Sequence, residues 1–235
     1  MNMRTDATAS TTSATGHAER ETNLIQDSRN SAEGGEYFHP SPNGDIRVTV
    51  STNDRAEGST NGNRAEVHNQ QFGTNQANDF ESWFTVHQGH SFSVAQLLNF
   101  GTDGGSPDLM FTVEKGAEGQ PNMLVARGRG VETTVIGPLP PNGHFGIKMQ
   151  YDGAGNFTAQ VYTGTELAPV PLGLPISGKL SGGGPLQFRA GVYFNGFNDT
   201  QAYPEGTDIS ADVVLHTPST AFRMQSEQHM SGSSL

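Results

Sequence analysis

Short runs of alternating apolar and polar residues recur along the chain from residue 36 onward, and they constrain the fold more than any other feature. Gly, Asn and Pro separate the runs, which follow one another about every ten residues. No long segment has the apolar period and the end caps of a helix. The pattern predicts an all-β sandwich or barrel, without the repeat period of a propeller. The runs are Ile46–Val50, Phe84–Val86, Phe92–Leu98, Leu109–Val113, Gly146–Tyr151, Phe157–Tyr162 and Ile209–Leu215.

The connections between these runs are predicted from their turn residues. Asp152–Asn156 places Asp, Gly and Asn between two alternating runs, which is a strong hairpin signal. His87–His90 is likewise interpreted as the turn of a hairpin that joins the run before it to the run after it. Gly164–Gly184 is treated as a loop whose structure the sequence does not predict.

The most informative run is Gln187–Tyr193, which lies between glycine- and asparagine-containing segments. In a strand, successive side chains point to opposite faces. One face then carries a guanidinium, a glycine and a phenol, while the other is apolar. This is typical of a sheet floor that holds an anionic ligand above a packed core, and equally of a strand whose Arg and Tyr face solvent. The first face comprises Gln187, Arg189, Gly191 and Tyr193, and the second Phe188, Ala190 and Val192.

Two further runs contain polar residues that need an explanation. In a strand, Arg64, Glu66 and His68 share one face, so the carboxylate can orient the guanidinium by a charge-assisted hydrogen bond. Taken alone, this run is more simply a surface ladder of ion pairs. Gln96 interrupts an apolar run, and a buried amide must be hydrogen-bonded. It is therefore either a member of a core network or a ligand contact.

Composition restricts the partners. The chain has 235 residues, a net charge of −11 and no Cys. The negative charge argues against recognition of nucleic acid or of an anionic membrane, and no apolar run is long enough to span a bilayer. Cysteine-bound zinc and disulfides are excluded, and His39, His144 and His216 lack the spacing of metal ligands. We expect no metal and no cofactor.

The domain organisation follows from the change in composition near residue 36. Residues 1–35 are polar and are expected to form a disordered leader, because they have too little apolar surface to offset the loss of chain entropy on folding. Residues 36–220 form the predicted domain, and residues 221–235 a flexible tail. The leader's composition is similar to that of bacterial type III secreted proteins. We therefore expect either export without a signal peptide or a cytoplasmic location. We also expect the protein to be a monomer.

In their order along the chain, the three polar runs resemble the alginate lyases of polysaccharide lyase family 7 and related β-jelly-roll lyases. Those enzymes line one groove with an Arg-Ser/Thr-Glu-Leu-Arg strand, a Gln-Ile-His strand and a Tyr-Phe-Lys-Ala-Gly-Val-Tyr-Asn-Gln strand. The resemblance covers roughly residues 36–217. It implies a two-sheet antiparallel jelly roll of the concanavalin A-like type, with an acidic polysaccharide as its partner.

The resemblance also implies roles for individual residues. Arg64 and Gln96 would neutralise the substrate carboxylate, Glu66 would brace Arg64, and Tyr193 would be the phenol that transfers protons. The implied substrate contacts, besides Glu66, are His68 in place of the family's second Arg, Arg189 in place of its Lys, and Asn195.

One departure from the family concerns the chemistry directly. Leu98 occupies the position of the catalytic His, and His87 and His90 are poor substitutes because a turn lies at the rim of a sheet. β-Elimination needs a base for the C5 proton and an acid for the leaving O4. In mannuronate and glucuronate both lie on one side of the sugar, so Tyr193 alone could serve both. The sequence predicts a lyase for such polymers. The alternative is an inactive carbohydrate-binding jelly roll, which could be a secreted bacterial effector.

Overall fold

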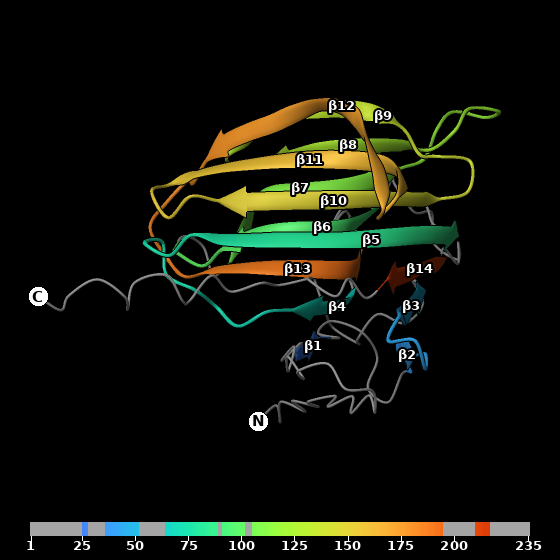
Figure 1. The fold of residues 1–235 in the computed structure, drawn as a ribbon, viewed down its shortest axis with the longest axis horizontal. Helices are drawn as coiled ribbons and strands as arrows, with labels where there is room; N and C mark the ends of the chain where they lie inside the picture. The colour runs from blue at the N-terminus through green and yellow to red at the C-terminus, as the bar shows by residue number, and fades with distance from the viewer. Residues whose placement is uncertain are drawn as a thin grey trace, which may run out of the picture.

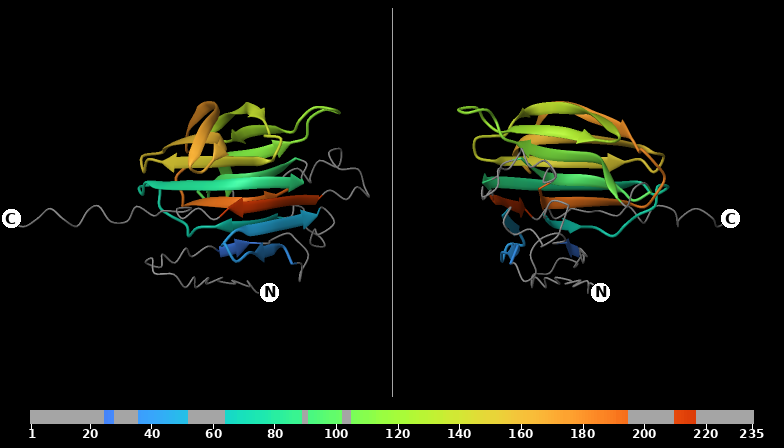
Figure 2. Two further views of the ribbon diagram at one scale, coloured as in Figure 1. Left: turned by 45° about the vertical axis from the view of Figure 1, so that its right-hand side comes forward. Right: turned by 180° about the vertical axis from the view of Figure 1, so that it is seen from behind.

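The computed structural model describes residues 25–27, 36–51, 64–88, 91–101, 105–194 and 210–216. These residues form two seven-stranded antiparallel sheets, which lie one behind the other in Figure 1 and are seen from two other directions in Figure 2. The described residues contain no helix, and therefore no helix that could cross a membrane. The predicted all-β jelly roll is confirmed.

We call the sheet that carries the three polar runs the site sheet. The other, called the opposite sheet, packs against its inner face. The site sheet has the order β1 (Ile25–Asp27), β4 (Arg64–His68), β13 (Leu186–Tyr193), β6 (Phe92–Asn99), β7 (Ser106–Glu114), β8 (Met123–Gly128) and β9 (Val131–Pro138). The opposite sheet has the order β12 (Ala168–Lys179), β11 (Asn156–Thr165), β10 (His144–Tyr151), β5 (Asn78–Gln88), β14 (Ser210–His216), β3 (Ile46–Ser51) and β2 (Phe38–Pro40).

The core lies between the sheets and follows from the alternation of side chains along each strand. On β13, the apolar set predicted from the sequence faces inward, and Phe188 packs against Phe80 of β5 with a centroid distance of 5.7 Å. Phe84 and Phe145 stack in the same layer at 5.4 Å. Because these rings bury large apolar areas, they fix which face of each strand is turned away from the core.

One predicted hairpin is confirmed and the other is wrong. β10 and β11 pair around Asp152, whose Oδ1 accepts hydrogen bonds from the backbone N–H groups of Ala154 and Asn156 at 2.7 and 2.9 Å. By contrast, β5 and β6 lie in different sheets, so the link around His87–His90 crosses the sandwich. Alternation shows that a strand is half-buried, but not which sheet it joins. The exposed His87 is the last residue but one of β5 in the opposite sheet, and His90 lies outside the described residues.

The expectation of a loop over Gly164–Gly184 is also wrong, because Ala168–Lys179 forms β12. This strand is an edge of the opposite sheet, and its partner among the described strands is β11. Pro169, Pro171 and Pro175 hide its pattern in the sequence. An edge strand tolerates proline because one side of its backbone needs no partner.

The expected leader contains a short strand. Ile25–Asp27 pairs with Glu66–His68 at the edge of the site sheet, where unpaired backbone groups of β4 offer hydrogen-bonding partners. At these three positions the structure differs from the expected disorder. The remainder of residues 1–35 and residues 217–235 lie outside the described residues.

The outer face of the opposite sheet carries a histidine pair beside the single Trp of the chain. Trp83 lies over Gly146, where a Cβ would come within 2.7 Å of its ring, and it stacks on His144 at 5.2 Å. Thr85 Oγ1 hydrogen-bonds to His144 Nδ1 at 3.0 Å and to His216 Nε2 at 2.7 Å. Burial lowers the pKa of His144, and the neighbouring His216 lowers it further.

We expect Trp83 fluorescence to report the titration of His144 with a midpoint below about pH 6.5, the ordinary value for histidine. The unfolded chain takes up this proton near its ordinary pKa, whereas the folded chain takes it up only at lower pH. The stability contributed by His144 is therefore complete above about pH 6.5 and is lost as the pH falls below it. Fluorescence titration and urea unfolding measure both effects. His144→Asn should flatten them, and a midpoint at or above pH 6.5 would contradict the assignment.

Candidate functional site

The outer face of the site sheet brings together the polar residues of β4, β13 and β6. Ala65 and Val67 are in the core, so their neighbours on β4 point outward. The register places Tyr193 opposite Arg64, and Arg189 opposite both His68 and Gln96. Residues opposite one another in an antiparallel pair share a face. The side chains predicted to share one face of β4 do so, as do those predicted for β13. The two strands are neighbours in the sheet, so the two sets of side chains adjoin.

Glu66 is the centre of this face. Its side chain is buried, and its Oε1 accepts a hydrogen bond from Gln96 Nε2 at 2.5 Å. Its Oε2 lies 3.4 Å from both Arg64 Nη1 and Arg189 Nη1. A buried carboxylate is tolerated only when it is paired and hydrogen-bonded in this way. We call Glu66, Arg64, Arg189 and Gln96, together with the neighbouring Tyr193, the cluster. Because two guanidiniums share one carboxylate, the cluster has an excess positive charge suited to an anionic ligand.

The Arg189 side chain is buried, and Gln187 of the same strand holds it. Its Nε and Nη2 donate to Gln187 Oε1 at 3.0 and 2.8 Å, and it is 2% exposed. Gln187 Nε2 in turn donates to the Asn69 carbonyl at 2.9 Å and lies 2.8 Å from His68 Nδ1. The expected substrate contact at Arg189 is thus a buried guanidinium that braces Glu66. Gln187 and Asn69 were not among the predicted site residues, although Gln187 was on the predicted face.

Tyr193 and Arg64 are the members of the cluster that reach the surface. The Arg64 guanidinium carbon lies 4.2 Å from the centre of the Tyr193 ring. Tyr193 is half-buried and the Arg64 side chain is 13% exposed. A guanidinium over an aromatic face is attractive and fixes the ring. A ligand carboxylate at this point would meet a positive charge and a phenol side by side.

Leu98 faces the same side of the sheet as the cluster. It lies directly opposite Gln187 and two residues beyond Gln96, while Leu97 between them is in the core. The apolar side chain is 5% exposed. At this position the outer face of the site sheet therefore has an apolar side chain and no acid or base. Of the other predicted residues, His68 is half-buried at the edge of the cluster, and Asn195 lies outside the described residues.

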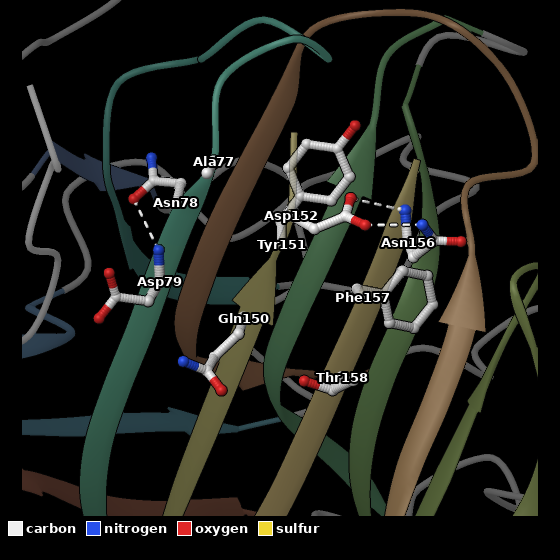
Figure 3. Close-up of a pocket in the computed structure, with 9 residues that line it drawn as sticks. All are labelled: Ala77, Asn78, Asp79, Gln150, Tyr151, Asp152, Asn156, Phe157 and Thr158. Atoms are coloured by element: carbon white, nitrogen blue, oxygen red, sulfur yellow. Dashed lines mark hydrogen bonds between the residues drawn. The ribbon is translucent and has the colours of Figure 1, made fainter. Parts of the chain in front are cut away.

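A separate pocket of 350 Å³ lies on the opposite sheet, near the β10–β11 turn (Figure 3). Asp79, Gln150 and Thr158 line it together with the turn residues Asp152 and Asn156. Hydrogen bonds from Asn156 hold the Asp152 carboxylate and lower its pKa, as does a bond from the backbone of Ala154. None of the site residues predicted from the sequence lies there. Among the described residues, no group of three or more His, Asp or Glu could hold a metal ion.

Comparisons with known proteins agree with this geometry at the level of the fold. No protein family model matches the sequence, and no curated protein matches it either. Solved structures of family 7 alginate lyases do match. The chain thus shares the jelly-roll fold of these lyases, at a sequence identity of 12–17% in the three structures described next.

Three of these structures illustrate the likeness. An alginate lyase of Pseudomonas aeruginosa aligns with a TM-score of 0.56 and 14% identity, over 80% of this chain and 85% of its own. The family 7 enzyme AlgAT5 aligns with a TM-score of 0.52 and 17% identity, over 77% and 80%. The family 7 enzyme A1-II′ aligns with a TM-score of 0.52 and 12% identity, over 77% and 81%.

Proposed function

We propose that this protein is a polysaccharide lyase that cleaves mannuronate- or glucuronate-type polymers by β-elimination. The observation that carries the proposal is the half-buried Tyr193 with the Arg64 guanidinium 4.2 Å from its ring, next to a buried carboxylate held by three donors. A lyase for uronates needs these two parts, a cation for the substrate carboxylate and a proton-transfer group beside it. The fold it shares with alginate lyases supports the same class.

The proposed reaction proceeds on one side of the sugar. The Tyr193 phenolate removes the C5 proton, and the electron pair left behind is stabilised through the carboxylate by Arg64. That pair then forms the C4=C5 double bond as the C4–O4 bond breaks. The Tyr193 hydroxyl returns its proton to O4, which leaves as the new hydroxyl end of the shortened polymer. Tyr193 is restored as phenolate, and the other product carries an unsaturated uronate.

The buried residues of the cluster act in this scheme as positioning residues. Glu66 holds Arg64 and Arg189 on one face, and Gln96 fixes the second oxygen of the Glu66 carboxylate. Since Gln96 and Arg189 are at most 2% exposed, their main effect is on the orientation of Glu66 and Arg64. A fixed arrangement of charges stabilises a developing anion without reorganising during the reaction.

A second candidate function is a carbohydrate-binding jelly roll without catalysis. The apolar Leu98 on the site face favours it, because it supplies no second acid or base. Incubating the protein with mannuronate, glucuronate and guluronate polymers distinguishes the two. The ultraviolet absorbance of the conjugated double bond reports elimination, and co-sedimentation or calorimetry reports binding. Binding without any rise in absorbance would support the second function and refute the first.

Leu98→His is expected to create or broaden activity, particularly on guluronate polymers. The new imidazole would lie on the same face as Tyr193, which provides the second group that elimination across the ring requires. The absorbance assay with guluronate polymer measures the effect. Leu97→His is the matched control, because Leu97 points into the core and its replacement should only destabilise the fold. A Leu98→His protein that is folded and has the activity of the parent would contradict the assigned position.

A further inference from the structure

Three buried polar atoms on neighbouring strands have no hydrogen-bond partner among the described residues. They are Ser93 Oγ on β6, Thr112 Oγ1 on β7 and Arg127 Nε on β8. These three strands lie side by side in the site sheet (Figure 1). Leaving a buried donor or acceptor without a partner costs free energy, so such atoms are rare in native proteins and indicate a missing partner.

The register of the sheet places these atoms in line with the proposed site. Tyr193 lies opposite Ser93, Ser93 opposite Thr112, and Thr112 opposite Val125. The core-facing neighbours along each strand show that Ser93 and Thr112 point to the outer face, as Tyr193 does. Since strands are about 4.8 Å apart, one row of side chains runs from Arg64 through Tyr193 to the two hydroxyls. A polymer that crosses the strands would pass over them all.

An ion pair covers the end of this row. Arg127 lies opposite Met110, and its guanidinium pairs with Glu114, four residues further along β7. The two side chains therefore extend along the strands over the Thr112–Val125 pair that lies between them. This explains why Thr112 and Val125 are only 3% and 2% exposed although they face away from the core. The ion pair itself is about one-third exposed, so little is lost when it opens.

We propose that Ser93, Thr112 and Arg127 form a second uronate subsite, which takes the carboxylate of a sugar neighbouring the one at Tyr193. The proposal rests on the proposed function. Two hydroxyls and a guanidinium are donors, and a carboxylate is an acceptor only, so the three atoms complement it. Arg127 exchanges Glu114 for the sugar carboxylate when the polymer binds, and Glu114 turns to solvent. Arg64 and Arg127, on either side of Tyr193, then each hold one carboxylate of the bound chain.

Thr112→Val tests the subsite, because valine has the shape of threonine without the hydroxyl. In the full chain carrying Tyr193→Phe, which binds without turnover, calorimetry with mannuronate and glucuronate tetramers should show an affinity about tenfold lower after the change. The stability of the free protein should stay equal or rise, since the lost hydroxyl had no partner. Thr158→Val, on the exposed face of the opposite sheet, should change neither quantity.

Each result decides between the subsite and a structural role. Unchanged tetramer affinity in Thr112→Val would overturn the subsite and leave the lyase proposal standing. A loss of stability with unchanged affinity would do the same and would assign the hydroxyl to a buried water. If the Tyr193→Phe parent binds neither tetramer, both proposals fail. Ser93→Ala gives the same test on β6 should the Thr112 variant fail to fold.

Discussion

Tyr193→Phe is expected to lower turnover of a mannuronate- or glucuronate-type polymer by at least about 10²-fold, as is typical when a general acid–base group is lost. The ring and its contact with the Arg64 guanidinium remain, so affinity should change by no more than a few-fold. The initial rate of double-bond formation gives the first quantity and calorimetry the second.

Tyr162→Phe is the control for this experiment. Tyr162 is also a half-buried strand tyrosine, but it lies on β11 of the opposite sheet. Its replacement should leave the rate unchanged. If Tyr193→Phe retains the wild-type rate, another residue carries out the proton transfer and the proposed mechanism is wrong.

Glu66→Gln is expected to destabilise the fold by about 3–5 kcal/mol, the cost of removing one partner of a buried ion pair. The variant leaves the Arg64 and Arg189 guanidiniums next to one another without the carboxylate that both contact at 3.4 Å. Arg189 is 2% exposed, so water compensates its charge poorly. Urea unfolding at neutral pH measures the loss.

Glu81→Gln provides the matched comparison. Glu81 pairs with Lys148 at 3.9 Å on the outer face of the opposite sheet, and both side chains are more than one-third exposed. Removing an exposed partner should cost less than about 1 kcal/mol. Equal effects of the two substitutions would show that Glu66 is not the electrostatic centre of the site sheet.

The faces of β13 and β4 could be predicted from the sequence because successive side chains of a strand point to opposite sides. In β13 and β4 the apolar residues fall on one side, and burial of Phe188 and Val67 in the core fixes the polar residues on the other. The position of Leu98 beside Gln96 follows from the same rule. For these strands, local pattern and tertiary packing point to one answer.

Other features depend on long-range pairing that local pattern does not contain. The partner strands of β5 and β6 are determined by the packing of the whole sandwich, whereas the local sequence is equally consistent with a hairpin between them. The burial of Arg189 depends on Gln187 and Glu66, which meet only when β13 and β4 pair. The ion pair of Arg127 and Glu114 joins β8 to β7, and no spacing in the sequence indicates it.

The most direct test of the central claim compares two polymers that differ only in configuration at C5. With Tyr193 as both base and acid, wild-type protein should produce the conjugated double bond from mannuronate polymer but not from guluronate polymer, whose C5 proton and O4 lie on opposite sides of the ring. The absorbance of the product, followed under identical conditions for both, gives the result. Cleavage of guluronate polymer at the rate of mannuronate polymer would contradict the account, as would binding of mannuronate polymer with no product at all.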